Sequence, residues 1–207
     1  MTRIVLVRHG ETVWHSENRY AGSTDINLTP KGVRQAEKLA NWARHADISA
    51  VWSSTLSRAR MTAQPTADTL NLPLCMDERL IELDFGRGEG LTDAEMVAKF
   101  PMQRAAFKLD PVTHHLPGGE DPVLAARRAM AALADLAAAA AAGRILVVTH
   151  NTLIRLVLCT ILEIPLSRYR NVFPQLMNGT FTELSLSAFP LLDAGLLSFN
   201  APLSTEE

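Results

Sequence analysis

The sequence predicts an α/β fold, a three-layer α/β/α sandwich with a mostly parallel central sheet. Short apolar runs with the character of buried strands alternate along the chain with segments of helical periodicity. The runs at residues 4–7 and 145–148 are apolar on both faces, as strands are when helices cover both sides of a sheet. With 207 residues, 47% of them hydrophobic, the chain can bury the core that such a fold requires.

The first predicted strand, 4–7, leads into a loop that contains glycine and asparagine and extends to residue 27. Thr29 is the predicted N-cap of the first helix, because its hydroxyl can accept a backbone N–H, and Pro30 suits the first helical position. Small and apolar residues follow at helical spacing, namely Ala36, Leu39, Ala40 and Ala43.

Residues 49–53 form the second predicted strand. The next helix is expected to begin at Ser54 or Thr55, and it carries Arg58. Pro65 should kink or interrupt this helix, because proline cannot donate the helical hydrogen bond.

A short strand and a loop are expected within residues 71–83, and an irregular segment with several prolines and glycines follows. One helix is predicted in that segment, around residues 92–100. We interpret residues 86–120 as an insertion, a lid or specificity segment over one end of the sheet, within a single domain that spans residues 1–207.

An alanine-rich helix is expected to begin at Asp121–Pro122 and to end near Gly143, a typical C-cap residue. The third buried strand, 145–148, follows it, and residues 151–162 are predicted to form an apolar helix. Two further runs are predicted to pair as strands, 180–186 and 195–199.

The overall charge and the cysteines argue against several classes of protein. A formal net charge of -2 argues against nucleic acid or an anionic membrane as the main partner. Cys75 and Cys159 have no metal-binding spacing, so two reduced thiols are favoured over a disulfide. The N-terminal apolar run is too short for a signal peptide, and no run is long enough to cross a membrane. A cytoplasmic protein is therefore expected.

Two histidines come directly after buried strands, His9 after the first and His150 after the third. Ligands of parallel sheets bind outside the carboxyl ends of the strands, so the two histidines are expected to share a site. A neutral imidazole is a nucleophile toward phosphorus, and a phosphohistidine splits one hard displacement into two easier ones. The other ring nitrogen of His9 must be held by an acceptor, for which the backbone carbonyl of Gly10 is a candidate.

Two arginines accompany these histidines, Arg8 before His9 and Arg58 at the start of the helix after the second strand. Guanidinium groups bind phosphate oxygens in a bidentate fork and stay charged at any working pH. Together with His150 as a donor, they could surround the oxygens of a transferring phosphoryl group. Structural alternatives stay open, because Arg58 could be a solvated helix residue and His150 could cap the following helix.

A metal site is the less favoured alternative for the two histidines. Arg8 would repel a cation, and neither histidine has a second histidine or a carboxylate cluster at ligand spacing. Phosphoryl transfer also needs a general acid for the leaving alkoxide. Glu82, flanked by apolar residues, could have a pKa raised by its setting. Residue types alone leave four candidates for the acid: Glu82, Asp84, Glu89 and Glu11.

At these residues the sequence resembles the histidine phosphatase superfamily, in the branch related to cofactor-dependent phosphoglycerate mutase. The resemblance covers most of the chain, and its most specific segment is Leu6–Thr12. Residues 28–36 are similar to the family's LTxxGxxQA motif, and residues 53–63 to its second arginine motif. Residues 80–90 resemble the loop that carries the family's acid. A Pro-Gly-Gly-Glu segment at 117–120 and a strand-end histidine in 147–150 complete the resemblance.

The resemblance implies a phosphoglycerate mutase-like fold and a role for each matched residue. His9 would be the nucleophile that becomes phosphorylated, and Glu82 would be the proton donor. Arg8, Arg58 and His150 would line the phosphate pocket. The family needs no metal, so no cofactor is expected, and a bisphosphoglycerate primer would be needed only by a mutase.

The chain departs from the family pattern at two places. Many relatives carry asparagine where this chain has His15, a position that touches the phosphate. His15 can still donate a hydrogen bond, but its charge would depend on pH near neutrality. After His150, Asn151 and Thr152 replace two small residues, and their backbone N–H groups could still face the phosphate. Gly22 and Ser23 are further candidates for the phosphate pocket.

The acceptor of the phosphoryl group separates a phosphatase from a mutase. Mutases that act on sugar acids hold a second anionic group with extra basic residues, in a long segment after the Glu-Gly pair. Here residues 91–110 form a short segment that is not rich in arginine. Its three basic residues are expected on a solvated helix face, namely Lys99, Arg104 and Lys108.

We therefore predict a phosphomonoesterase that acts on a small phosphorylated metabolite, with a mutase as the alternative. An alternative of another class is a catalytically silent module that binds a phospho-ligand, but the presence of both His9 and Glu82 argues against it. Specificity should lie mainly in residues 86–120, and a homodimer is compatible with the sequence. The expected contacts to the leaving group are Phe85, Phe100, Phe107, His114 and His115.

Overall fold

The computed structural model describes residues 2–139, 143–187 and 194–203, and within them a six-stranded sheet forms the centre. The strands lie in the order β3-β2-β4-β1-β5-β6. Strands β1 to β4 pair in parallel, whereas β5 and β6 add an antiparallel edge. The prediction of a mostly parallel sheet is confirmed. The strand bounds are β1 (Thr2–Arg8), β2 (Ile48–Ser53), β3 (Leu74–Met76), β4 (Gly143–Thr149), β5 (Phe181–Leu186) and β6 (Ala194–Ala201).

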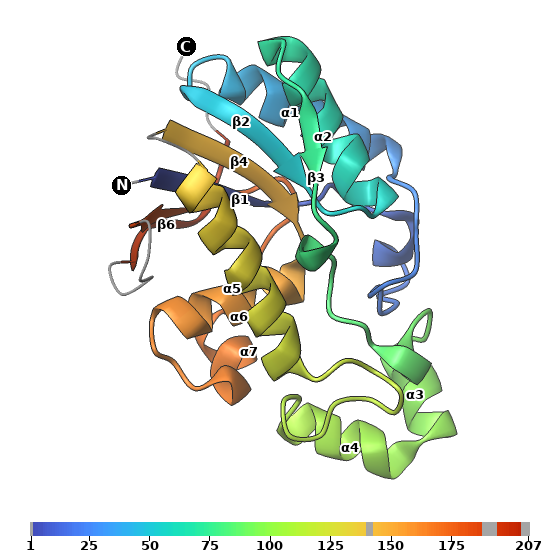
Figure 1. Ribbon diagram of the computed structural model, residues 1–207. Coiled ribbons are helices and arrows are strands. Elements are labelled where there is room, and N and C mark those ends of the chain that lie inside the picture. Colours follow the sequence, from blue (N-terminus) through green and yellow to red (C-terminus); the bar gives the residue numbers. More distant parts are fainter. Residues whose placement is uncertain (1, 140–142, 188–193, 204–207) are drawn as a thin grey trace.

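Helices cover both faces of this sheet, as Figure 1 shows. Helices α1 (Pro30–Ala43) and α2 (Ser57–Leu70) pack with Val5 and Val7 of β1 in one apolar cluster. Helices α5 (Pro122–Ala139) and α6 (Asn151–Ile161) pack in a second cluster with residues of the opposite face of β1. Alternate side chains of β1 thus enter two different cores, which is why this strand is apolar at every central position.

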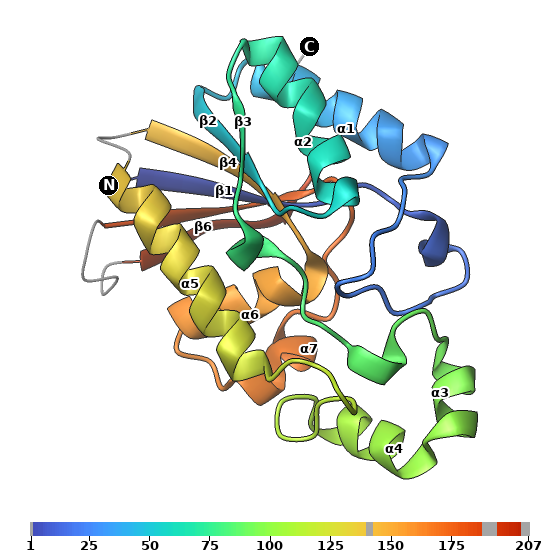
Figure 2. The same cartoon turned by 45° about the vertical axis from the view of Figure 1, so that its right-hand side comes forward.

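The remaining helices are short, and α3 (Asp93–Lys99) and α4 (Pro101–Leu109) lie apart from the sheet in both views (Figures 1 and 2). Helix α7 (Tyr169–Val172) packs against α6. Single 3₁₀ turns cover residues 13–15, 78–80, 86–88 and 166–168. None of the helices in the described ranges has the length and apolar character that crossing a membrane requires.

The first half of the chain follows the predicted order, with two differences in α2. Thr29 caps α1 as predicted, and its hydroxyl oxygen accepts the Gly32 N–H at 3.1 Å. Helix α2 begins at Ser57, later than expected, because Leu56 keeps an extended backbone. Pro65 does not interrupt α2, which continues to Leu70. The helix packs against the core along one small-residue face, which consists of Ala59, Ala63 and Ala67.

The insertion and the helix after it differ from the prediction in more detail. Two helices occupy the segment in which one was expected, because Pro101 takes the first position of a new helix, α4, directly after α3. Arg104 is buried at 6% exposure and pairs with Asp93, so the solvated face expected for it is wrong. Lys99 and Lys108 are exposed as expected. Gly143 is the first residue of β4, and residues 140–142 before it lie outside the described residues.

The loop after β1 lies directly against the first turn of α1. A Cβ atom on Gly10 would lie 2.6 Å from the carbonyl oxygen of Gly32. A Cβ atom on Gly32 would overlap the carbonyl oxygen of Glu11. Two glycines are therefore needed for this close approach of backbone to backbone, which fixes the course of the chain immediately after His9.

We predict that Gly32→Ala destabilises the protein, although alanine is the better helix former by about 1 kcal/mol in an open helix. The added methyl group must displace the Glu11 carbonyl, so the free energy of unfolding should fall by about 1–3 kcal/mol. Urea denaturation measures this change. Val33→Ala, at the exposed neighbouring position, should stay within about 0.5 kcal/mol of the wild type. A Gly32→Ala protein as stable as the wild type would refute the close approach.

Candidate active site

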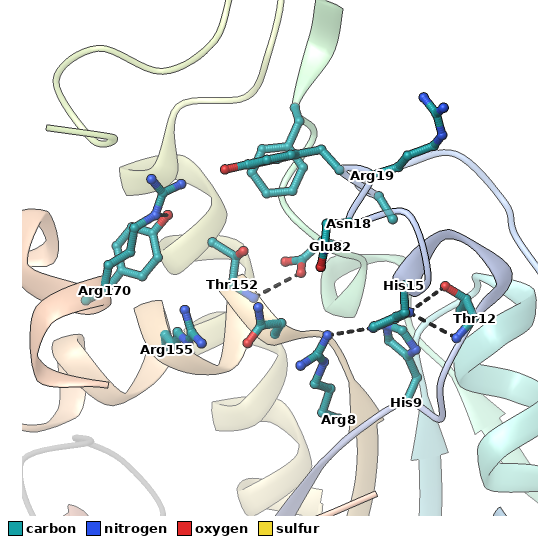
Figure 3. A pocket seen from close by; sticks show the side chains of 15 residues that line it. Arg8, His9, Thr12, His15, Asn18, Arg19, Glu82, Thr152, Arg155 and Arg170 are labelled. Atoms are coloured by element: carbon teal, nitrogen blue, oxygen red, sulfur yellow. Dashed lines mark hydrogen bonds between the residues drawn. The ribbon is translucent and has the colours of Figure 1, made fainter. Parts of the chain in front are cut away.

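A cavity of about 340 Å³ opens beyond the carboxyl ends of β1 and β4, where the sequence places its candidate residues. Figure 3 shows this cavity from close by. Six of the predicted site residues line it, namely Arg8, His9, His15, Glu82, Asn151 and Thr152. Arg58 and His150 are fully buried and are not part of the lining. The structure thus brings together residues from both ends of the chain.

His9 leaves β1 with its ring in a defined orientation. Its backbone N–H donates to the carbonyl oxygen of Thr149 in the neighbouring strand at 3.0 Å. Its Nδ1 lies 2.7 Å from the carbonyl oxygen of Gly10. Because a carbonyl can only accept, Nδ1 carries the proton and Nε2 keeps its lone pair. Burial, and next the charges of Arg58 and Arg8, lower the pKa of His9 well below its usual value. His9 is therefore a neutral imidazole with one free nitrogen.

His150 is the N-cap residue of α6 and lies beside His9, with ring centroids 5.2 Å apart. Its Nε2 lies 2.7 Å from the hydroxyl of Ser54. Its Nδ1 is buried and has no hydrogen-bond partner in the described part of the chain. Burial, followed by the charge of Arg58, lowers the pKa of His150 as well. Two neutral imidazoles therefore share this edge of the sheet.

The two arginines take different positions. Arg8 donates through Nη1 to the carbonyl of Leu176, and its Nη2 lies 2.8 Å from Nε2 of His15. Arg58 is completely buried and donates to the carbonyl oxygens of Thr24 at 2.8 Å and Gly22 at 2.6 Å. Burial lowers the pKa of Arg8 to about 10, so its guanidinium group is still charged at neutral pH. The Nε atoms of both arginines are buried without a partner among the described residues.

Glu82 is buried at the N-terminus of α6, with 4% of its surface exposed. Its Oε1 accepts the backbone N–H groups of Leu83 at 2.9 Å and Leu153 at 3.0 Å, and its Oε2 accepts that of Thr152 at 2.9 Å. The positive end of the helix dipole adds to this attraction. The N–H of Thr152 is thus used by Glu82, whereas the sequence suggested a phosphate as its partner.

His15 lies in an environment that disfavours its charged form. The backbone N–H of Thr12 donates to Nδ1 at 3.0 Å, and Arg8 faces Nε2, as the dashed lines of Figure 3 show. Burial, and next the charge of Arg8, lower the pKa of His15 to about 4. The expectation that its charge changes near neutral pH is therefore wrong, and His15 is neutral there.

Gly22 and Ser23 lie behind the site and outside the cavity lining. The carbonyl of Gly22 holds Arg58, and a Cβ atom at Gly22 would overlap the carboxylate of Glu89. Ser23 is exposed, and its N–H and hydroxyl donate to Oε1 of Glu89 at 2.6 Å and 3.1 Å. Both residues belong to the loop whose backbone carbonyls hold the guanidinium group of Arg58, a residue of α2.

Several cavity residues were not found from the sequence, above all Arg155 on α6 and Arg170 on α7. The sequence did offer a signal for Arg155, which is a charged residue within a predicted apolar helix. Such a residue is rarely buried without a partner, so its partner could have been a ligand. No sequence signal marked Arg170. The further lining residues absent from the prediction are Thr12, Asn18, Arg19, Tyr20, Ala21 and Tyr169.

Of the residues expected to contact a leaving group, Phe85 lines the cavity. Phe100 and Phe107 are buried in the core, and His114 and His115 are exposed away from the lining. Among the described residues, no group of three or more histidine, cysteine, aspartate or glutamate side chains is placed to hold a metal ion.

Comparisons with known proteins place this arrangement among phosphate-handling enzymes. A family model described as histidine phosphatase superfamily (branch 1) matches residues 4–188. Phosphoserine phosphatase 1 of Hydrogenobacter thermophilus is 29% identical over 169 residues, which cover 82% of this chain and 80% of that protein. A probable phosphoglycerate mutase, GpmB of an Enterobacter species, is 32% identical over 200 residues, or 94% and 90% of the two chains.

A solved structure of a mycobacterial glucosyl-3-phosphoglycerate phosphatase in complex with VO3 superposes with a TM-score of 0.87. The two chains are 29% identical, and the match covers 97% of this chain and 100% of the other.

The lowered histidine pKa values predict a dependence of stability on pH. The unfolded chain takes up protons on His9, His15 and His150 near their usual pKa of about 6.5, whereas the folded chain does not. The free energy of unfolding should therefore be highest above that pH and should decrease as the pH falls toward about 4, the pKa of His15. Urea denaturation at a series of pH values measures this decrease. In His15→Asn the decrease should be shallower, and a curve parallel to that of the wild type would contradict the role of His15.

Proposed function

Since the chain belongs to the histidine phosphatase superfamily, we propose that it is a phosphomonoesterase that hydrolyses a small phosphorylated metabolite through a phosphohistidine at His9. One observation carries this proposal. Three buried N–H or ring nitrogen groups near His9 have no partner among the described residues: Nε of Arg8, Nε of Arg58 and Nδ1 of His150. An unpaired buried donor costs about 1–3 kcal/mol, and the oxygens of a phosphoryl group would offset this cost at each of them.

The first step transfers the phosphoryl group to the protein. The lone pair on Nε2 of His9 attacks phosphorus, and the bond between phosphorus and the ester oxygen breaks. Arg8, Arg58 and His150 hold the three remaining oxygens while charge redistributes over them. Glu82 gives its proton to the leaving oxygen. Its Oε2 accepts only the N–H of Thr152, so a lone pair is left on that atom to carry the proton.

The second step returns the protein to its starting state. A water molecule takes the place of the leaving group, and the Glu82 carboxylate accepts its proton. The oxygen of this water forms a bond to phosphorus as the bond to His9 breaks, which releases inorganic phosphate. The N–H donors of α6 orient Glu82 in both steps, so the same group acts first as an acid and then as a base.

A phosphoglycerate mutase is the second candidate, because a relative that is 32% identical bears that name. In a mutase the acceptor is a second hydroxyl of the retained product instead of water. Turnover of 3-phosphoglycerate with and without a bisphosphoglycerate primer separates the two reactions by their products. We favour water as the acceptor because the insertion is short, two helices of 7 and 9 residues.

We further propose that residues 86–120 act as the specificity segment of a single domain. The two ends of this insertion meet, since the N–H of Arg87 donates to the carbonyl of Pro117 at 2.9 Å. Phe85, directly before it, lines the cavity. The insertion is thus joined to the rest of the chain at a narrow base beside the site. The partner would be a small metabolite in the cytoplasm, and a metal would not be required.

We predict that His9→Ala lowers kcat/KM for an aryl phosphate by about 10³-fold or more, because no other group supplies the nucleophile. His45→Ala, which removes an exposed histidine, should be as active as the wild type. Wild-type enzyme that has reacted with a phosphate ester labelled in its phosphoryl group, and is then denatured at alkaline pH, should carry a labelled phosphate that mild acid removes. His9→Ala treated in the same way should carry none. EDTA should not change the rate. Equal turnover by His9→Ala and the wild type would rule out covalent catalysis.

We predict that Glu82→Gln slows alkyl phosphates at least about tenfold more than aryl phosphates. An alkoxide is a poor leaving group and needs the proton from Glu82, whereas a nitrophenolate leaves without one. Glu78→Gln, an exposed carboxylate in the preceding turn, serves as the matched control. A uniform loss for both classes of ester would mean that Glu82 is structural.

A further inference from the structure

We propose that Arg155 and Arg170 form a second anion subsite of the cavity, which binds a carboxylate carried by the leaving group of the substrate. The inference rests on the proposed phosphatase function and names the class of substrate that this site takes. It is carried by two guanidinium groups that line the cavity and have no acidic partner in the described part of the chain.

Arg155 is a buried cation, and its N–H donors are not fully satisfied by the described residues. It projects from α6, is only 9% exposed, and lines the cavity. Its Nη2 makes a long hydrogen bond of 3.3 Å to the carbonyl of Pro174, and its Nε is buried with no partner among the described residues. A buried guanidinium group that lacks a carboxylate is costly in a protein that has no ligand for it. An anion in the cavity would supply the missing partner.

Arg170 lies on α7, and aromatic rings hold its guanidinium group. Its guanidinium carbon lies 4.4 Å from the ring centroid of Phe107 and 5.3 Å from that of Tyr169. Its Nε donates to the hydroxyl of Tyr169 at 2.9 Å. Contact with ring faces fixes the plane of the guanidinium group while leaving N–H donors at its edge, which is how arginine presents a fork to an acid.

Arg19, another arginine that lines the cavity, differs from Arg155 and Arg170 because it has acidic partners. It is paired with Glu17 at 2.8 Å and with Glu95 at 2.7 Å. Its charge is therefore already balanced by the protein. For Arg155 and Arg170 no ion pair is found in the described ranges, and the one carboxylate that lines the cavity is Glu82.

The position of these arginines points to the leaving group. In Figure 3 they lie on one side of Glu82 and Thr152, while His9 and His15 lie on the other side. A phosphate at His9 would turn its ester oxygen toward Glu82, the proposed proton donor. The substituent on that oxygen then extends toward Arg155 and Arg170. A carboxylate there would offer two oxygens to two guanidinium groups.

The basic residues of the segment 91–110 do not contribute to this subsite. They are not among the cavity residues, and Arg104 is paired with Asp93 inside the insertion. The candidate subsite comes from α6 and α7, far along the chain from that segment.

The test compares esters that differ in the carboxylate. O-phosphoserine is paired with O-phosphoethanolamine, and 3-phosphoglycerate with glycerol 3-phosphate. The wild type should prefer the carboxylate-bearing ester of each pair by about 10- to 100-fold in kcat/KM. Arg170→Gln should reduce this ratio by a similar factor. Arg168→Gln removes an exposed arginine two residues away and should leave the ratio unchanged. Arg155→Met keeps about the volume of the buried side chain but removes its charge, and it should reduce the same ratio of kcat/KM values.

Two outcomes would overturn the subsite: turnover without any preference within the pairs, or an equal loss for both members of a pair in Arg170→Gln. Calorimetric titration of the same esters into His9→Ala separates this failure from that of the proposed function. Selective binding of the carboxylate esters without wild-type turnover would retain the subsite and reject the phosphatase. Turnover without selective binding would retain the phosphatase and reject the subsite.

Discussion

The site depends on the parallel pairing of β1 with β4. In this register Arg8 lies opposite Thr149, and the chain continues on both strands with a histidine. The hydrogen bond from the N–H of His9 to the carbonyl of Thr149, 3.0 Å long, extends the pairing one residue beyond β1. A shift of one residue would turn the side chains of β1 to the opposite faces and separate the two histidines. The two apolar cores on either side of the sheet fix the register, so they also fix the site.

Burial gives the residues around His9 their chemical character. Arg58 is fully buried and has no ion pair with any of the described residues, and backbone carbonyls of a loop from the first quarter of the chain satisfy its Nη atoms. That loop is in turn held by Glu89, which binds the N–H groups of Ser23 and Thr24. The charge of Arg58, added to desolvation, keeps His9 and His150 neutral. The same charge that would attract a phosphate therefore also maintains the lone pair that would attack it.

Features set by short stretches of sequence could be predicted, and those set by packing could not. The strand-end histidines and the cap at Thr29 follow from local rules of pattern and capping, which is why they were found. The continuity of α2 through Pro65 depends on its contacts with the core, and the burial of Arg104 depends on its pairing with Asp93. Arg155 and Arg170 reach one cavity only because α6 and α7 pack together. The setting of Glu82 likewise depends on a helix that follows it by about seventy residues.

Helix α6 sets a length scale for what the cavity can take. Its first turn holds Glu82 through the N–H groups of Thr152 and Leu153, and Arg155 follows at most one turn later. One turn of helix advances about 5.4 Å, so the backbone that holds Glu82 and the backbone that carries Arg155 lie within about one turn of each other. This spacing favours a short leaving group, with its acid close to the ester oxygen. The same rigid helix thus couples the chemistry at Glu82 to the choice of substrate, whether water or a second hydroxyl accepts the phosphoryl group.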